Sequence, residues 1–122
     1  MKKKMLVVED DKAFAFVLSK YYSNLYRVEV ATSSNDCQET IRRFTPDVVL
    51  LDYYLPGKTG GELFTIIRNA CPNARIIILS ANESSQTVVD LIKIGVRDYV
   101  VKDDNALDEI DKILKESSEE AN

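Results

Sequence analysis

Histidine is absent from this sequence of 122 residues, and cysteine occurs only twice. Without histidine, a Cys–His zinc site, a Cys–His nucleophile and an internal phosphohistidine are all excluded. The two cysteines, Cys37 and Cys71, fit a reducing compartment. No segment approaches the roughly 20 apolar residues of a membrane span, and the apolar run after the N-terminal lysines is too short for a signal peptide. We therefore expect a cytoplasmic protein.

The overall composition is that of one soluble globular domain. The chain is 45% hydrophobic and 30% charged, and its length allows a core without disulfides or a structural metal. A formal net charge of −4 argues against a nucleic-acid-binding surface, which needs clustered lysine and arginine. We expect one domain over residues 1–116, followed by an acidic tail or the start of a linker over residues 117–122.

Two hydrophobic periods alternate along the chain. Short apolar runs, typical of buried strands, cover residues 5–8, 26–31, 48–51, 76–79 and 99–101. Helical spacing is found over residues 12–23, 34–45, 62–71, 84–94 and 105–116, with proline or glycine ending several of these segments. The spacing predicts inward-facing residues Phe14, Val17, Leu18 and Tyr21 in the first helix and Val88, Val89, Leu91 and Ile92 in the fourth.

Strands that are apolar on both faces must be covered on both faces, which predicts a parallel sheet between two layers of helices. We therefore predict a doubly wound α/β domain of the flavodoxin-like type, with five parallel strands in the order 2-1-3-4-5. In such sheets ligands bind beyond the carboxyl ends of the strands, where the strand order reverses. Here that point lies between the first and third strands.

Polar residues follow four of the predicted strands. They are Glu9 and Asp10 after the first, Asp52 after the third, Ser80 after the fourth and Lys102 after the fifth. Three carboxylates at one sheet edge repel one another, and a hard divalent cation such as Mg²⁺ relieves this repulsion. An aspartate facing that ion can attack phosphorus, while a lysine and a hydroxyl hold phosphoryl oxygens. Taken singly, each residue is also consistent with a helix cap, a turn or a solvated charge.

Together these residues resemble the motifs of the receiver domains of two-component response regulators, over nearly the whole chain from Lys4 to about Lys115. The matching segments are VVEDD, VVLLDYYLPGKTG, IIILSA and DYVVKD. The resemblance implies that Glu9, Asp10, Asp52 and the backbone carbonyl of Tyr54 bind Mg²⁺. It implies that Asp52 accepts a phosphoryl group from a sensor histidine kinase or a histidine phosphotransfer protein. Such a domain is not an enzyme for other substrates and catalyses only its own phosphorylation and dephosphorylation.

The resemblance also implies a switch. Ser80 and Tyr99 would respond to the phosphoryl group and reshape the surface of the fourth helix, fifth strand and fifth helix. That surface could form a phosphorylation-dependent homodimer, for which Lys93, Arg97 and Asp98 offer mixed charges. Tyr99 is equally consistent with a strand aromatic that packs on the fourth helix.

Two further positions concern the lifetime of the phosphoryl group. The resemblance implies that Tyr54 and Asn82 flank it and control access of water, so a bulky Tyr54 should slow its loss. The alternative for Tyr54 is an exposed loop aromatic.

The sequence departs from the family pattern at Asp103, where proline usually follows the lysine. A cis bond before aspartate costs roughly 3–4 kcal/mol. We therefore expect a trans Lys102–Asp103 bond, Lys102 pointing into the acidic cleft, and Asp103 or Asp104 capping the last helix.

Three alternatives use related chemistry. A phosphatase with an aspartyl-phosphate intermediate needs a second acid at the position of Tyr54. A flavin-binding module needs a phosphate-cradling loop after the first strand, where this chain has three acids. A receiver that no longer takes phosphate would act only as a binding module.

Overall fold

The computed structural model describes residues 2–81 and 84–120, with side chains described up to residue 116. Within these ranges the strands are β1 (Lys3–Val8), β2 (Tyr26–Ala31), β3 (Val48–Asp52), β4 (Arg75–Ser80) and β5 (Asp98–Val101). The helices are α1 (Lys12–Tyr22), α2 (Ser34–Arg43), α3 (Gly60–Ala70), α4 (Ser85–Lys93) and α5 (Ala106–Glu120). No described helix is long and apolar enough to span a membrane. Asn82 lies outside the described residues.

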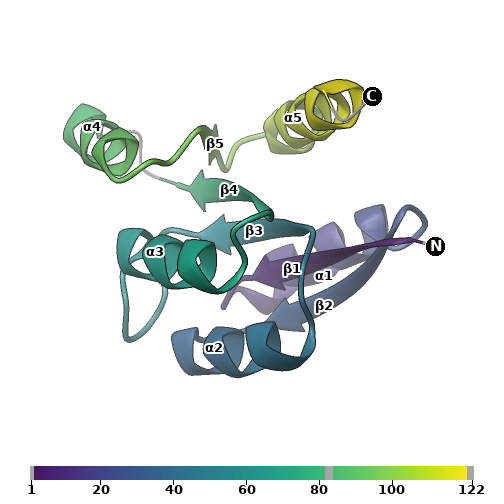
Figure 1. The fold of residues 1–122 in the computed structure, drawn as a ribbon. Helices are drawn as coiled ribbons and strands as arrows, with labels where there is room; N and C mark the ends of the chain where they lie inside the picture. The colour runs from purple at the N-terminus through teal and green to yellow at the C-terminus, as the bar shows by residue number, and fades with distance from the viewer. Residues whose placement is uncertain (1, 82–83, 121–122) are drawn as a thin grey trace.

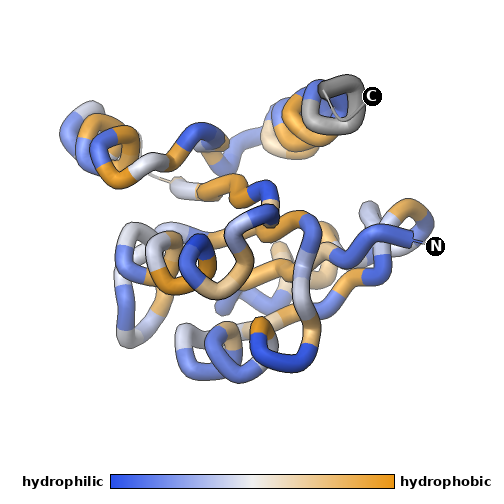
Figure 2. Tube along the Cα trace, in the orientation of Figure 1, coloured by the Kyte–Doolittle hydropathy of each residue, from blue (hydrophilic) through white to orange (hydrophobic). Residues whose placement is uncertain are grey.

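The strands form one parallel sheet in the order β2-β1-β3-β4-β5, as the sequence predicts (Figure 1). β1 pairs with β2 on one side and with β3 on the other, so the strand order reverses at β1. The central strand β3 is buried throughout, and β1 is buried from Met5 to Val8. Figure 2 shows the corresponding apolar colour along the middle of the sheet.

Two hydrophobic clusters, one on each face, hold the layers together. The cluster under α2, α3 and α4 includes Leu6, Leu51 and Ile78, and the cluster under α1 and α5 includes Val7, Leu50 and Ile77. Successive residues of each strand enter opposite clusters, because side chains alternate across a sheet. In Figure 1, α2 and α3 lie in front of the sheet and α1 behind it. Both cysteines are free and buried.

Local hydrogen bonds fix where the helices begin. The carboxylate of Asp11 accepts hydrogen bonds from the backbone N–H groups of Ala13 and Phe14, at 3.0 and 3.2 Å. Ser33 and Thr59 cap α2 and α3 in the same manner. Gly95 follows α4 with a φ of +102°, a conformation that glycine adopts without strain.

The inward faces predicted for α1 and α4 are partly wrong. In α1 the buried residues are Ala15, Leu18 and Tyr22, whereas Val17 and Tyr21 are about half exposed. The small Ala15 lets the helix approach the sheet, and a pattern weighted toward large apolar residues misses it.

In α4, Leu91 alone is fully buried, and Val89 and Ile92 are exposed. The helix lies near the edge strand β5, so few of its side chains reach the hydrophobic core (Figure 1).

The last helix extends further than the sequence predicts. α5 continues to Glu120 instead of ending near residue 116. The residues after 116 contain neither proline nor glycine, so no local signal stops the helix there. Ile110 is fully buried on its inner face, and Leu107, Ile113 and Leu114 pack beside it as expected.

Candidate functional site

The strand register brings the predicted site residues to one edge of the sheet. Val8 pairs with Leu51, which places Glu9 beside Asp52 at the end of β3. Asp52 pairs with Leu79, and the next residue, Ser80, ends β4. Ser80 pairs with Val101, directly before Lys102. Polar residues that are far apart in the sequence therefore lie together.

The three carboxylates form a compact cluster. Carboxylate oxygens of Glu9, Asp10 and Asp52 lie within 4.8 Å of one another. Glu9 is 1% exposed and Asp52 is 3% exposed, whereas Asp10 faces solvent. Two acids thus lie at the base of the site and one at its mouth.

Lys102 reaches into this cluster. Its Nζ donates hydrogen bonds to both carboxylate oxygens of Glu9, each at 2.9 Å, and lies 3.1 Å from Oδ1 of Asp52. No cis peptide bond occurs among the described residues, so the Lys102–Asp103 bond is trans. The carboxylate of Asp103 accepts a hydrogen bond from the Asn105 backbone N–H at 2.8 Å, just before α5. The predicted trans bond and orientation of Lys102 are confirmed.

Burial and charge perturb the titration of both partners. Burial raises the pKa of Glu9 to about 7, and the negative charge of Asp52 adds to this effect, although the hydrogen bonds from Lys102 oppose it. Burial alone would lower the pKa of the Lys102 ammonium, but the hydrogen bonds to Glu9 and the charges of Asp52 and Glu9 outweigh it and raise the pKa. One ammonium does not fully offset three clustered acids.

The donor set suits a hard divalent cation. Mg²⁺ prefers oxygen ligands, and three carboxylates with oxygens within 4.8 Å offer such ligands. The adjacent backbone is ordered by a hydrogen bond of 3.2 Å from the Tyr54 N–H to Oδ1 of Asp52 and by a bridge between Tyr54 and Thr59. The expected role of the Tyr54 carbonyl as a ligand stays a prediction.

The predicted switch residues differ in burial. Ser80 is completely buried at the end of β4, and its carbonyl accepts a hydrogen bond of 2.9 Å from the Lys102 N–H. Tyr99 is half-buried and packs against the cluster under α2, α3 and α4. The packing expected of a strand aromatic is therefore present, and the switch role of Tyr99 stays a prediction.

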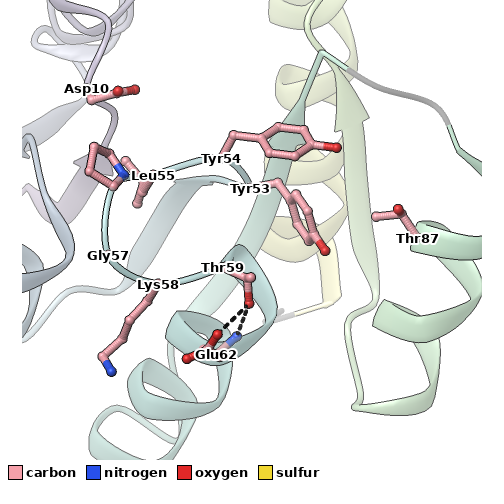
Figure 3. Close-up of a pocket in the computed structure, with 10 residues that line it drawn as sticks. Asp10, Tyr53, Tyr54, Leu55, Gly57, Lys58, Thr59, Glu62 and Thr87 are labelled. Atoms are coloured by element: carbon pink, nitrogen blue, oxygen red, sulfur yellow. Dashed lines mark hydrogen bonds between the residues drawn. The ribbon is translucent and has the colours of Figure 1, made fainter.

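A cavity of about 670 Å³ opens beside the acidic cluster (Figure 3). Its lining comes from Asp10, the loop between β3 and α3, Glu62 in the first turn of α3, and Thr87 on α4. The rings of Tyr53 and Tyr54 meet edge to face, with centroids 4.8 Å apart, and Tyr54 is 49% exposed. The two residues that directly follow Asp52 therefore place packed aromatic rings beside the cavity.

Glycine is required where this loop enters α3. A Cβ at Gly60 would lie 2.7 Å from the Cα of Tyr53, closer than real Cβ contacts allow. The Gly60 N–H donates a hydrogen bond of 2.8 Å to the Tyr53 carbonyl. This close approach holds the loop that carries both tyrosines against the start of α3.

Sequence reasoning missed three residues around the site. Tyr53 and Thr87 line the cavity, and the ring of Phe14 lies under the Lys102 ammonium, with 5.1 Å between Nζ and the ring centroid. Phe14 was assigned only to the inner face of its helix. Its place in the first turn after the acidic cluster was the available signal.

Comparisons with known proteins agree with this geometry. The family described as response regulator receiver domain matches residues 5–115. The chain is 32% identical over 105 residues to the chemotaxis protein CheY of Thermotoga maritima, covering 84% of this chain and 87% of that protein. It is also 32% identical over 101 residues to the Regulator of RpoS of Escherichia coli, covering 82% of this chain but only 30% of that protein. The chain therefore spans under a third of the length of some curated relatives.

Solved structures show the same similarity. A CheY-like receiver domain from Methanospirillum hungatei superimposes with a TM-score of 0.88 at 25% identity, covering 98% of this chain and 96% of the other. The BeF3-activated receiver domain of DrrB gives a TM-score of 0.84 at 27% identity, covering 94% and 97%. Both the fold and the sequence pattern extend over nearly the whole chain.

Proposed function

Because the chain belongs to the response regulator receiver domain family, we propose that Asp52 accepts a phosphoryl group from a phosphohistidine in a reaction that requires Mg²⁺. The observation that carries this proposal is the position of Asp52. It is buried, its carboxylate lies within 4.8 Å of two other acids, and the Lys102 ammonium is 3.1 Å away. This arrangement favours phosphoryl transfer, which depends mainly on positioning and neutralisation of charge.

Each residue has a defined part in this reaction. A carboxylate oxygen of Asp52 attacks phosphorus and the bond to the imidazole nitrogen of the donor breaks, which leaves an acyl phosphate on Asp52 and a histidine on the donor. The Lys102 ammonium balances charge on a phosphoryl oxygen, and the Ser80 hydroxyl donates a hydrogen bond to another. Mg²⁺ held by Glu9, Asp10, Asp52 and the Tyr54 carbonyl would neutralise further negative charge.

The partners follow from this chemistry. The phosphodonor is a sensor histidine kinase or a histidine phosphotransfer protein, since this chain has no histidine of its own. We place this signalling in the cytoplasm. The receiver unit itself is proposed to be residues 1–116, although α5 continues beyond that point.

Turnover of other substrates is not part of the proposal. An aspartyl-phosphate phosphatase needs a second acid two residues after the nucleophile, and Tyr54 occupies that position. The chain would then catalyse only its own phosphorylation and slow dephosphorylation. Tyr54 is bulky and half-exposed and would slow the access of water to the acyl phosphate. Asn82 is proposed to flank the phosphoryl group together with Tyr54.

The switch is proposed to run through β4 and β5. The hydrogen bond from the Lys102 N–H to the Ser80 carbonyl ties together the ends of these strands. A change at Asp52 that moves Ser80 or Lys102 would reach Tyr99 and the surface of α4, β5 and α5, where a homodimer could form.

One residue of the proposed dimer contact needs correction. The guanidinium of Arg75 donates two hydrogen bonds to the Asp98 carboxylate, at 2.6 and 3.1 Å, and the Asp98 side chain is 11% exposed. Asp98 is therefore occupied within its own chain. Lys93 and Arg97 are exposed and are retained in the proposal.

Phosphorylation by a small donor tests the proposed function. With acetyl phosphate and Mg²⁺, we expect the intact mass to rise by one phosphoryl group in the wild type and not in Asp52→Asn. Asp104→Asn, at an exposed acid in the loop after Lys102, is the matched control and should label like the wild type. Equal labelling of Asp52→Asn would remove Asp52 as the acceptor. Failure of every form to label would favour a receiver that acts only as a binding module.

A further inference from the structure

The Lys102 ammonium has an aromatic contact in addition to its carboxylate partners. Its Nζ lies over the ring of Phe14, 5.1 Å from the centroid, within the range of a cation–π interaction. The Lys102 side chain is 19% exposed, so the contact is partly shielded from water. Such shielding strengthens the attraction between an ammonium and a ring face.

The ring is held by a rigid element. Phe14 lies in the first turn of α1, and its backbone N–H donates a hydrogen bond of 3.2 Å to the Asp11 carboxylate that caps the helix. The side chain is half-buried and packs against the cluster shared by α1 and α5. The position of the ring is therefore fixed relative to the acidic cluster, since Asp11 directly follows Asp10.

The loop after Lys102 gives its side chain little independent support. A backbone hydrogen bond of 2.9 Å from Asp103 to Val101 closes a tight turn around Lys102, and the next residues are exposed. Among the described residues, the Lys102 ammonium contacts the carboxylates of Glu9 and Asp52 and the ring of Phe14. Glu9 and Asp52 are the two groups that the proposed reaction would occupy, whereas the ring of Phe14 would stay available throughout.

We infer that Phe14 is a positioning residue that keeps the Lys102 ammonium aimed into the acidic cleft through the face of its ring, an inference that rests on the proposed function for its effect on phosphorylation. The ring neither contacts the phosphoryl donor nor transfers a proton. It restricts where the ammonium can lie when its carboxylate partners change. The alternative is that Phe14 has only a packing role in the hydrophobic cluster beneath α1.

A double-mutant cycle separates these two roles. Phe14→Leu removes the ring but keeps apolar volume, and Lys102→Met removes the charge. The free protein is unfolded in urea without Mg²⁺, so this arm does not depend on phosphorylation. Phe14→Leu should raise the equilibrium constant for unfolding in both backgrounds. If the ring binds the ammonium, the fold-increase should be at least about threefold smaller in the Lys102→Met background than in the wild-type background. Equal shifts in both backgrounds would leave only a packing role and overturn the inference.

The second arm measures the rate of phosphorylation by acetyl phosphate with Mg²⁺. Phe14→Leu should slow labelling about five- to tenfold, whereas Phe14→Tyr, which keeps the ring, should restore most of the rate. Phe16→Leu is the matched control, because Phe16 is 62% exposed on the same helix and the ammonium over its ring is that of Lys20. A wild-type rate in Phe14→Leu would refute the positioning role even if the contact exists. This arm also decides the inference if Lys102→Met does not fold.

The two arms distinguish the possible failures. A wild type that takes no phosphoryl group would contradict the proposed function, while the unfolding cycle would still decide whether the contact between Phe14 and Lys102 exists. A labelled wild type with an unchanged Phe14→Leu rate would contradict the inference alone.

Discussion

Replacing Glu9 with glutamine should stabilise the metal-free protein at high pH. Glu9 is 1% exposed and its pKa is raised from 4.5 to about 7 by burial and by the charge of Asp52, even with two hydrogen bonds from Lys102. An acid with a raised pKa in the folded state favours folding less and less as the pH rises above its unfolded pKa. Glutamine keeps the shape and removes the ionisation.

The size of this effect follows from the same pKa. The raised pKa of Glu9 lowers the free energy of unfolding by about 3 kcal/mol at pH 8 and by about 1 kcal/mol at pH 5, because the unfolded carboxyl ionises near pH 4.5 and the folded one near 7. Glu9→Gln should therefore gain stability over the wild type by about 2 kcal/mol on going from pH 5 to pH 8.

Urea unfolding at both pH values, with a chelator present, measures this difference. Glu39→Gln, at an exposed position on α2, is the control, and its stability should differ from that of the wild type by nearly the same amount at pH 5 and pH 8. Added Mg²⁺ should stabilise the wild type more than Glu9→Gln if Glu9 is a ligand. A stability difference between wild type and Glu9→Gln that is the same at pH 5 and pH 8 would show that the pKa of Glu9 is not raised in the fold.

Two substitutions away from the acidic cluster test the framework that holds it. Gly60→Ala should destabilise the fold by about 1–3 kcal/mol, because its Cβ would clash with backbone, whereas Gly61→Ala should be mild, since its Cβ would meet the flexible end of Ile94 at 3.4 Å. Arg75→Gln should cost about 2–3 kcal/mol by leaving a largely buried carboxylate without its ion pair, whereas Arg43→Gln should cost less than about 1 kcal/mol, because the Arg43 side chain is 64% exposed. Urea unfolding checks both pairs, and equal costs within either pair would contradict the corresponding argument.

The site was largely predictable because it depends on strand ends. Glu9, Asp52 and Lys102 each follow an apolar run, and parallel strands end at the same edge of a sheet. Their meeting at about 3 Å therefore needs only the strand order, which short crossover helices restrict strongly. The trans bond at Asp103 was likewise predictable from the energy of a single peptide bond.

What the sequence could not show depends on rotation and on pairing across elements. Hydrophobic spacing places a helix on a sheet but does not fix its rotation by one residue, so Ala15 and Tyr22 were missed in α1. The contact of the Phe14 ring with Lys102 joins α1 to the end of β5, and the place of Phe14 in the sequence does not show that these two residues meet. Asp98 appeared available for a contact with another protein, because Arg75, with which it forms an ion pair, lies 23 residues away in the sequence.

The site of phosphorylation can be located chemically, which tests whether Asp52 is the acceptor. After phosphorylation with acetyl phosphate and Mg²⁺, borohydride reduction converts an aspartyl phosphate into homoserine, which peptide mass mapping can assign to one residue. We expect homoserine at residue 52 and at no other aspartate position. Homoserine at Asp10 or elsewhere, or a phosphoryl group that borohydride does not reduce, would contradict it.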